Sequence, residues 1–143
     1  MMKVRDILDN KGSEIISVTS VATVFETLQV MAQREIGAVL VMTGGNPVGI
    51  FSERDYARQV ILKGKASKDT RVSEVMTSRV VYIRPEQTLD DCMALMTDKR
   101  VRHLPVLEDG RLCGVLSIGD VVKAMIRDKQ FIIEQLENYI ASG

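Results

Sequence analysis

One stretch of this chain occurs twice, and that duplication limits the possible folds more than any other feature. Residues 45–55 read GNPVGIFSERD, and residues 110–120 read GRLCGVLSIGD, at an offset of 65 positions. Both glycines, the serine and the aspartate coincide without a gap. The same offset pairs residues 23–31 with residues 88–96, so the duplication covers most of the protein. We therefore expect two copies of one structural unit.

The length of the chain indicates how the two copies relate to each other. Of its 143 residues, 45% are hydrophobic and 27% are charged, as in ordinary soluble globular proteins. A copy of about 60 residues would bury only ~60% of the surface that its unfolded chain exposes. We therefore expect the two copies to share one core.

Charge and cysteine content exclude several classes of protein. Nineteen Lys and Arg balance nineteen Asp and Glu, which removes the electrostatic basis for general nucleic-acid binding. The sequence contains neither a secretory signal peptide nor an apolar run of about 18 residues. We expect a cytoplasmic protein that binds neither nucleic acid nor membrane. Cys92 and Cys113 lack the spacing of a disulfide framework and are expected to be buried free thiols.

Each copy has the same predicted order of elements. A capping box, Thr23 with Glu26 or Thr88 with Asp91, begins an amphipathic helix. Two short apolar runs around a glycine-containing turn predict a hairpin, and a Ser-x-x-Asp sequence begins another helix. A helical leader and a β-branched run precede each copy, and the leaders align only if the first contains three extra residues. In the first copy the helical leader is expected at 4–8, the β-branched run at 15–18 and the two hairpin strands at 38–42 and 47–51. In the second copy the same elements are expected at 72–76, 80–83, 104–107 and 112–116.

These repeated motifs resemble a tandem pair of cystathionine β-synthase (CBS) domains. The resemblance rests on the leading helix, the apolar-Pro-Val strand at 104–106 and the repeated Gly-hydrophobic-hydrophobic-Ser-x-x-Asp element. It implies an α/β fold of the α+β type, with two β-α-β-β-α repeats related by a pseudo-two-fold axis and their small sheets facing each other. The expected boundaries are residues 1–66 and 67–128 for the repeats and 129–143 for a C-terminal helix.

The resemblance also implies a function. Clefts between CBS repeats commonly bind adenosine-containing molecules. For this chain we expect AMP, with ATP, ADP, NAD or S-adenosylmethionine as alternatives. Members of the family usually sense such ligands and regulate a protein partner, which the sequence does not identify. They commonly form homodimers through their helices, and the amphipathic tail at residues 131–140 offers apolar surface for this.

The repeated serine and aspartate suit a ribose site. The two oxygens of a carboxylate can accept hydrogen bonds from the two adjacent hydroxyls of a ribose, and the N–H groups of a helix N-terminus attract phosphate. However, Ser-x-x-Asp at a helix start is also the pattern of a plain capping box, which needs no ligand. Both interpretations stay open, and a serine can cap the helix while the aspartate binds the sugar.

The family resemblance assigns the remaining residues of each cleft, with each Ser-Asp element facing the other copy. The first cleft is expected to use Ser52, Arg54, Asp55, Thr77, Val80, Tyr82, Val101, Arg102, His103 and Pro105. The second is expected to use Ser117, Asp120, Ile15, Ile16, Ser17, Ile36, Gly37, Ala38 and Val39. Because arginine and histidine gather only in the first set, we hypothesise that the first cleft prefers the more phosphorylated or larger ligand. Leu40, where the family usually has proline, makes the second adenine pocket less typical.

Several of these residues can also be explained without a ligand. His103 is either a phosphate contact or a solvated residue at a strand end, and the cations between Arg54 and Arg71 are either a solvated surface or phosphate contacts. Catalysis is not expected, because the single histidine and two separated cysteines match no metal set or nucleophile–base pair. The alternative function is a protein-interaction module whose clefts are vestigial.

Overall fold

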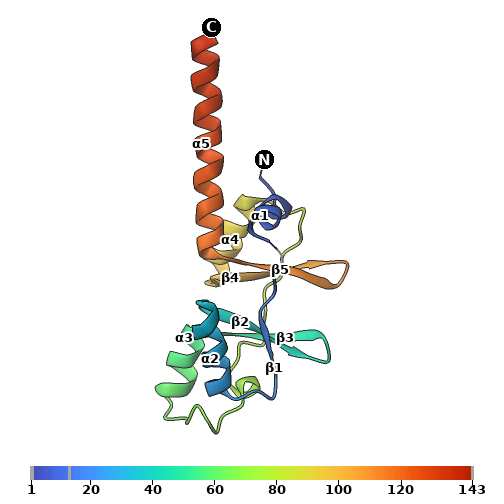
Figure 1. The fold of residues 1–143 in the computed structure, drawn as a ribbon, viewed down its shortest axis with the longest axis vertical. Coiled ribbons are helices and arrows are strands. Elements are labelled where there is room, and N and C mark those ends of the chain that lie inside the picture. The colour runs from blue at the N-terminus through green and yellow to red at the C-terminus, as the bar shows by residue number, and fades with distance from the viewer. Residues whose placement is uncertain (1, 13, 143) are drawn as a thin grey trace. The chain divides into compact units, whose positions relative to one another are not determined.

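The computed structural model describes residues 2–12 and 14–142, which fold into two compact units (Figure 1). Unit 1 consists of Met1–Glu14 together with Val81–Gly143, and unit 2 consists of Ile15–Val80. The units therefore do not follow the order of the repeats in the sequence. The leader of each copy packs with the body of the other copy.

Unit 2 is built on a three-stranded sheet. Its strands are β1 (Ser17–Thr19), β2 (Ala38–Thr43) and β3 (Asn46–Ser52), in the order β1-β2-β3. β1 is parallel to β2, and β2 is antiparallel to β3. Gly44 and Gly45 both have positive φ, as a tight two-residue hairpin turn requires. The expected hairpin is confirmed.

The helical segments of unit 2 are α2 (Val24–Arg34), α3 (Glu53–Asp55), a π-helix (Tyr56–Ile61) and a 3₁₀ turn (Val72–Glu74). The capping box predicted at Thr23 is present, with Thr23 Oγ1 accepting from the Glu26 N–H at 3.1 Å. The helix expected after Ser52 is only one turn of α-helix before it widens into the π-helix. The leader expected at 72–76 is the shorter 3₁₀ turn.

Unit 1 contains the hairpin of β4 (His103–Glu108) and β5 (Arg111–Ser117), whose antiparallel register repeats that of β2 and β3. α1 (Val4–Lys11), α4 (Leu89–Lys99) and the first turns of α5 (Ile118–Ser142) lie on one face of this hairpin (Figure 1). The strand expected at 80–83 is wrong, because only Ile83 pairs, through a single parallel bridge with Val106. The tail continues α5 without a break.

Two separate clusters of buried apolar side chains, one in each unit, replace the single shared core that the length suggested. The unit 1 cluster includes Val4, Ile7 and Leu8 of the first leader. The unit 2 cluster includes Val72 and Val75 of the second leader. The copies therefore depend on each other because they exchange their leaders. No described helix is long and apolar enough to span a membrane.

Corresponding backbone hydrogen bonds hold the two exchanged leaders. The Val4 N–H donates to the Gln87 carbonyl at 2.8 Å, and the Leu89 N–H donates to the Met2 carbonyl at 3.0 Å. In unit 2, the Val24 N–H donates to the Thr70 carbonyl at 2.8 Å, and the Val72 N–H donates to the Ala22 carbonyl at 2.8 Å. Each leader is thus fixed to the N-terminal end of the amphipathic helix of the other copy.

Candidate functional site

The Ser-Asp element of unit 2 lies where β3 passes into α3. Ser52 Oγ accepts from the Asp55 N–H at 3.1 Å, while Asp55 Oδ2 accepts from the Ser52 N–H at 2.9 Å and from Ser52 Oγ at 3.0 Å. The capping interpretation is therefore confirmed here, and the aspartate takes part in the cap as well as the serine. Asp55 remains half-buried.

Thr77 binds the second oxygen of the same carboxylate. Its hydroxyl donates to Asp55 Oδ1 at 3.0 Å. Two backbone bonds with Ile50, at 2.9 and 3.0 Å, hold Thr77 beside β3. This approach requires Gly49, because a Cβ there would lie 2.9 Å from the Thr77 carbonyl oxygen and would overlap Met76. The structure therefore brings together three of the predicted residues, Ser52, Asp55 and Thr77.

Unit 1 repeats the element where β5 passes into α5. Ser117 Oγ accepts from the Asp120 N–H at 3.2 Å, and Asp120 Oδ2 accepts from the Ser117 N–H at 2.8 Å and Ser117 Oγ at 3.0 Å. Gly114 occupies the place of Gly49 and faces the Leu8 side chain of α1. The two units thus present the same cap on the same strand-to-helix junction.

Lys11 distinguishes the two elements. Its ammonium group lies 2.6 Å from Asp120 Oδ2 and also donates to the Val115 carbonyl. Burial raises the pKa of Asp120, but the hydrogen bonds from Lys11 and Ser117 outweigh it, so the pKa lies below its ordinary value. Sequence reasoning missed Lys11 because it lies beside the extra residues of the first leader, where the two copies do not align. The available signal was a lysine at the end of a helical leader that has no counterpart in the other copy.

The strand that neighbours each Ser-Asp element supplies further predicted residues. Ser52 pairs with Ala38 in the β2–β3 ladder, and the Glu53 N–H donates to the Gly37 carbonyl at 3.0 Å. In unit 1, Ser117 pairs with His103, and the Ile118 N–H donates to the Arg102 carbonyl at 2.8 Å. Within each unit, the element therefore adjoins the first residues of the neighbouring strand.

The other predicted residues divide between the units. Unit 1 carries Tyr82, Val101 and Pro105, and burial raises the pKa of the Tyr82 hydroxyl. Unit 2 carries the remainder, namely Arg54, Val80, Ile15, Ile16, Ser17, Ile36 and Val39. Val39 and Pro105 are buried, and Arg54 and Arg102 are exposed. Each predicted cleft draws residues from both units and remains a prediction.

Unit 1 also contains a cavity of about 310 Å³ that the sequence did not predict. Arg5, Asp9, Glu108 and Cys113 are among its lining residues. Arg5 forms ion pairs with Glu108 and, at 3.1 Å, with Glu86. The contact with Glu108 fixes α1 to the hairpin and the contact with Glu86 fixes it to the segment before α4, which is a sufficient structural role. Across residues 2–12 and 14–142, no group of His, Cys, Asp and Glu has the arrangement of a metal site.

The two cysteines are free, as expected. Cys92 is buried in α4, and burial raises the pKa of its thiol to about 11. Cys113 on β5 is only partly buried, so the expectation of full burial is wrong for this residue. Burial also raises the pKa of the Cys113 thiol, which therefore is not poised as a nucleophile.

Comparison with known proteins gives a consistent result. The CBS domain profile matches residues 4–61 and 72–127. CBS domain-containing protein CBSX3, mitochondrial, from Arabidopsis thaliana is 35% identical over 98% of this chain and 72% of its own length. A CBS-domain structure from Burkholderia ambifaria MC40-6, described in terms of signal transduction, has a TM-score of 0.86 at 48% identity, covering 89% of this chain and 96% of its own. The CBS-domain protein ATU1752 from Agrobacterium tumefaciens has a TM-score of 0.83 at 42% identity, covering 87% and 99%.

Proposed function

Because this chain belongs to the CBS-domain family and carries two copies of the domain, we propose that it is a regulatory protein that binds an adenosine nucleotide and catalyses no reaction. Proteins with paired CBS domains are generally regulatory and bind ligands that contain adenosine. AMP is the first candidate, and ADP, ATP, NAD and S-adenosylmethionine are the others. One observation carries the proposal: Asp55 and Asp120 are both half-buried and lie at corresponding strand-to-helix junctions in the two units.

The geometry of the caps supports a sugar contact through one oxygen of each carboxylate. Oδ2 is already occupied by the serine in both units. Within the described part of the chain, Oδ1 of Asp120 has no hydrogen bond, and Oδ1 of Asp55 accepts the movable Thr77 hydroxyl. Each carboxylate oxygen has two lone pairs, so Oδ1 can accept a ribose hydroxyl without breaking the cap.

The proposed difference in ligand preference between the sites now has to include Lys11. The sequence-based hypothesis gave the more phosphorylated ligand to the cleft of Asp55, on the basis of Arg54, Arg102 and His103. Lys11 adds a cation beside Asp120 that this hypothesis did not count. A nucleotide at Asp120 would bring its phosphate close to an ammonium group that already balances a carboxylate. Titration of AMP and ATP at each site therefore decides the preference.

The test replaces each aspartate by asparagine, because asparagine also caps helices well. Its amide oxygen can keep the bond to the serine N–H, while its NH₂ group replaces Oδ1 and cannot accept from a hydroxyl. We expect the wild type to gain about 2.7 kcal/mol of stability at a ligand concentration of 100 Kd. Asp55→Asn and Asp120→Asn should each remove the gain from one site. Without ligand, Asp55→Asn should leave the melting temperature nearly unchanged, whereas Asp120→Asn also loses the ion pair with Lys11 and should cost about 0.5–1 kcal/mol of stability. The site assignment is wrong if both variants keep the full shift with AMP, ATP and NAD.

A second candidate function is an interaction module without ligand. It is favoured by the completeness of both caps, since serine, threonine and lysine already supply partners to the two aspartates. Such a module should show no thermal shift with any adenosine compound. We further propose that the protein forms a homodimer and acts on a protein partner, because the described part of α5 exposes large apolar side chains that a monomer would leave in water.

A further inference from the structure

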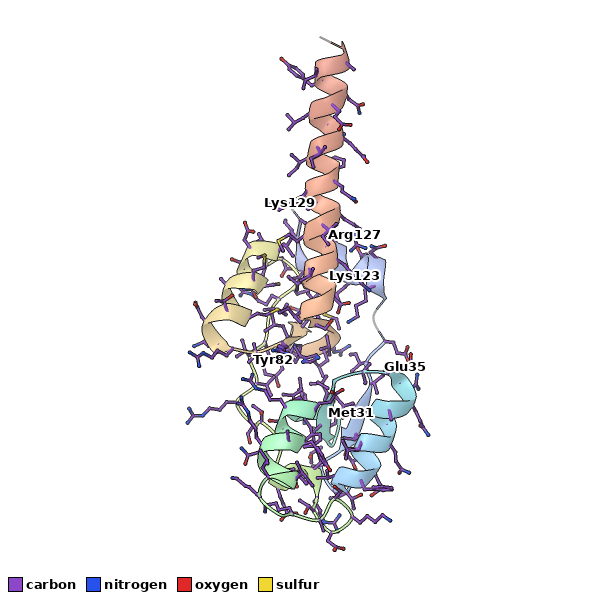
Figure 2. The ribbon with its side chains drawn as sticks, turned by 90° about the vertical axis from the view of Figure 1, so that its left-hand side faces the viewer. Met31, Glu35, Tyr82, Lys123, Arg127 and Lys129 are labelled. Atoms are coloured by element: carbon purple, nitrogen blue, oxygen red, sulfur yellow. The ribbon has the colours of Figure 1, made fainter. Side chains whose placement is uncertain are left out.

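The outer half of α5 is uncovered. Every described side chain from Lys129 to Ala141 is exposed, and the exposed fractions are 52% for Ile133, 57% for Leu136 and 76% for Ile140. Beyond Lys129 no other element of unit 1 lies beside the helix (Figure 2). The match to the CBS domain ends at residue 127, so this part of the helix lies outside the family domain.

Apolar side chains follow a heptad repeat along α5. The positions 122, 126, 129, 133, 136 and 140 are separated by alternating steps of four and three residues. This spacing places all six on one narrow stripe, the a and d positions of a coiled coil. We call this stripe the α5 seam. Its residues are Val122, Ile126, Lys129, Ile133, Leu136 and Ile140.

The α5 seam is not the face by which the helix packs on its own unit. Val121 and Ala124 are buried in the unit 1 core. Val122 and Ile126 on the α5 seam are 42% and 53% exposed, although they belong to the same turns. The α5 seam therefore continues past the body of the unit as a stripe that is apolar except at Lys129.

We propose that the α5 seam binds the α5 seam of a second copy of this chain, in a parallel two-stranded coiled coil. Isoleucine at the three a positions, 126, 133 and 140, with leucine at a d position is the combination that favours two parallel strands. A helical segment of fewer than about 15 residues is marginal alone in water, so the uncovered half of α5 needs a partner.

The exposed apolar area of the α5 seam and the residues at its flanking positions are compatible with a second copy of the chain as the partner. Exposed seam side chains of on the order of 100 Å² each, with Ile132 and Tyr139 at the edge, approach the ~800 Å² that one partner buries in a standard interface. The flanking e positions, 123, 130 and 137, would face apolar g positions, 125, 132 and 139, so no like charges meet there. Lys129, at a d position, would face Lys129 of the second copy, and this single charged layer would lower the stability of the coiled coil.

The first test changes the seam without changing the rest of the helix. The wild type at micromolar concentration should sediment with twice the 15.9 kDa mass of the chain. Ile133→Glu, or Ile140→Glu as a second variant, should raise the dimer dissociation constant by at least about 100-fold, because a carboxylate would be buried in the seam. Gln135→Glu adds the same charge off the seam and should leave the dimer intact. Circular dichroism checks that each variant is folded.

The second test determines strand orientation. In a Cys113→Ser background, Leu136→Cys should form a disulfide-linked dimer on mild oxidation, because parallel d positions face each other. Gln135→Cys should cross-link much less. Lys129→Leu should lower the dissociation constant by about tenfold or more, because it replaces the charged layer by an apolar one.

The outcomes separate this inference from the homodimer on which it rests. A wild-type dimer that Ile133→Glu leaves unchanged overturns the α5 seam but keeps the proposed homodimer. A dimer that dissociates on Ile133→Glu but does not cross-link at Leu136→Cys overturns the parallel arrangement. A monomeric wild type overturns both the seam and the homodimer, while nucleotide binding is judged separately by the thermal shifts of the aspartate variants.

Discussion

The repeated glycines at 49 and 114 provide a matched pair of substitutions with different expected costs. Neither has a positive φ, so alanine suits both backbones. At Gly49 a Cβ would lie 2.9 Å from the Thr77 carbonyl oxygen and would overlap the Met76 side chain. At Gly114 the Cβ would lie 2.6 Å from Leu8 Cδ2, and the other Leu8 atoms near it are at 3.6 Å. At Gly49 the added Cβ would therefore contact backbone as well as a side chain, whereas at Gly114 it would contact only the end of a flexible side chain.

The magnitudes follow from this difference. Overpacking that moves backbone costs about 1–3 kcal/mol. The Thr77 carbonyl cannot move without straining the two backbone hydrogen bonds between Thr77 and Ile50. Replacing glycine by alanine also lowers the conformational entropy of the unfolded chain, which stabilises the folded protein by about 0.4–1 kcal/mol at either site. We therefore expect Gly49→Ala to destabilise the protein by up to about 2.5 kcal/mol, and by more than Gly114→Ala, which should cost less than about 1 kcal/mol.

Thermal and urea unfolding measure these costs. At about 2–4 °C per kcal/mol for a chain near this size, Gly49→Ala should lower the melting temperature by up to roughly 10 °C. Gly37→Ala is the control, because its Cβ would meet the Glu53 side chain at ordinary distances, 3.6 Å to Oε1 and 4.0 Å to Cδ. Equal losses at 49 and 114, or a larger loss at 114, would refute the argument that backbone contact with the exchanged leader requires the first glycine.

Two further predictions concern titratable groups. Lys11→Met should lower the stability at pH 7 by about 0.5–1 kcal/mol, because it removes a partly exposed ion pair. The lowered pKa of Asp120 stabilises the fold above the unfolded value near 3.9 and loses this effect as the pH falls through the folded pKa, so urea unfolding should show the difference from wild type shrinking below about pH 4. In the native protein at pH 8, Cys92 should resist a thiol reagent and react only on unfolding, since its pKa is about 11. Rapid labelling of Cys92 in folded protein would show that α4 opens more readily than its burial indicates.

Features that depend on neighbouring residues were predictable from the sequence. The caps at Thr23, Thr88, Ser52 and Ser117 and both hairpins follow from side chains within a few positions, so their patterns are visible in the chain. The apolar spacing at residues 131–140 also predicted the helical conformation that these residues have in α5.

Features that depend on distant residues were not predictable in the same way. The run at 80–83 has a β-branched composition, but only Ile83 finds a strand to pair with. The π-helix at 56–61 has the apolar spacing of an α-helix, so periodicity does not distinguish the two. The ion pair of Lys11 with Asp120 joins residues 109 positions apart and depends on where α1 packs.

The exchange of leaders sets an order for folding during synthesis. Unit 2 is a continuous segment, Ile15–Val80, and can close as soon as the ribosome has released it. α1 is made before unit 2, yet the segment that buries Val4 and Ile7 begins only at Val81. Because domains generally fold as units during translation, α1 should reach its final place only after unit 2 has folded. Until then its apolar face is available to chaperones, and a chain that stops near residue 80 should retain one folded unit with a loose N-terminal arm.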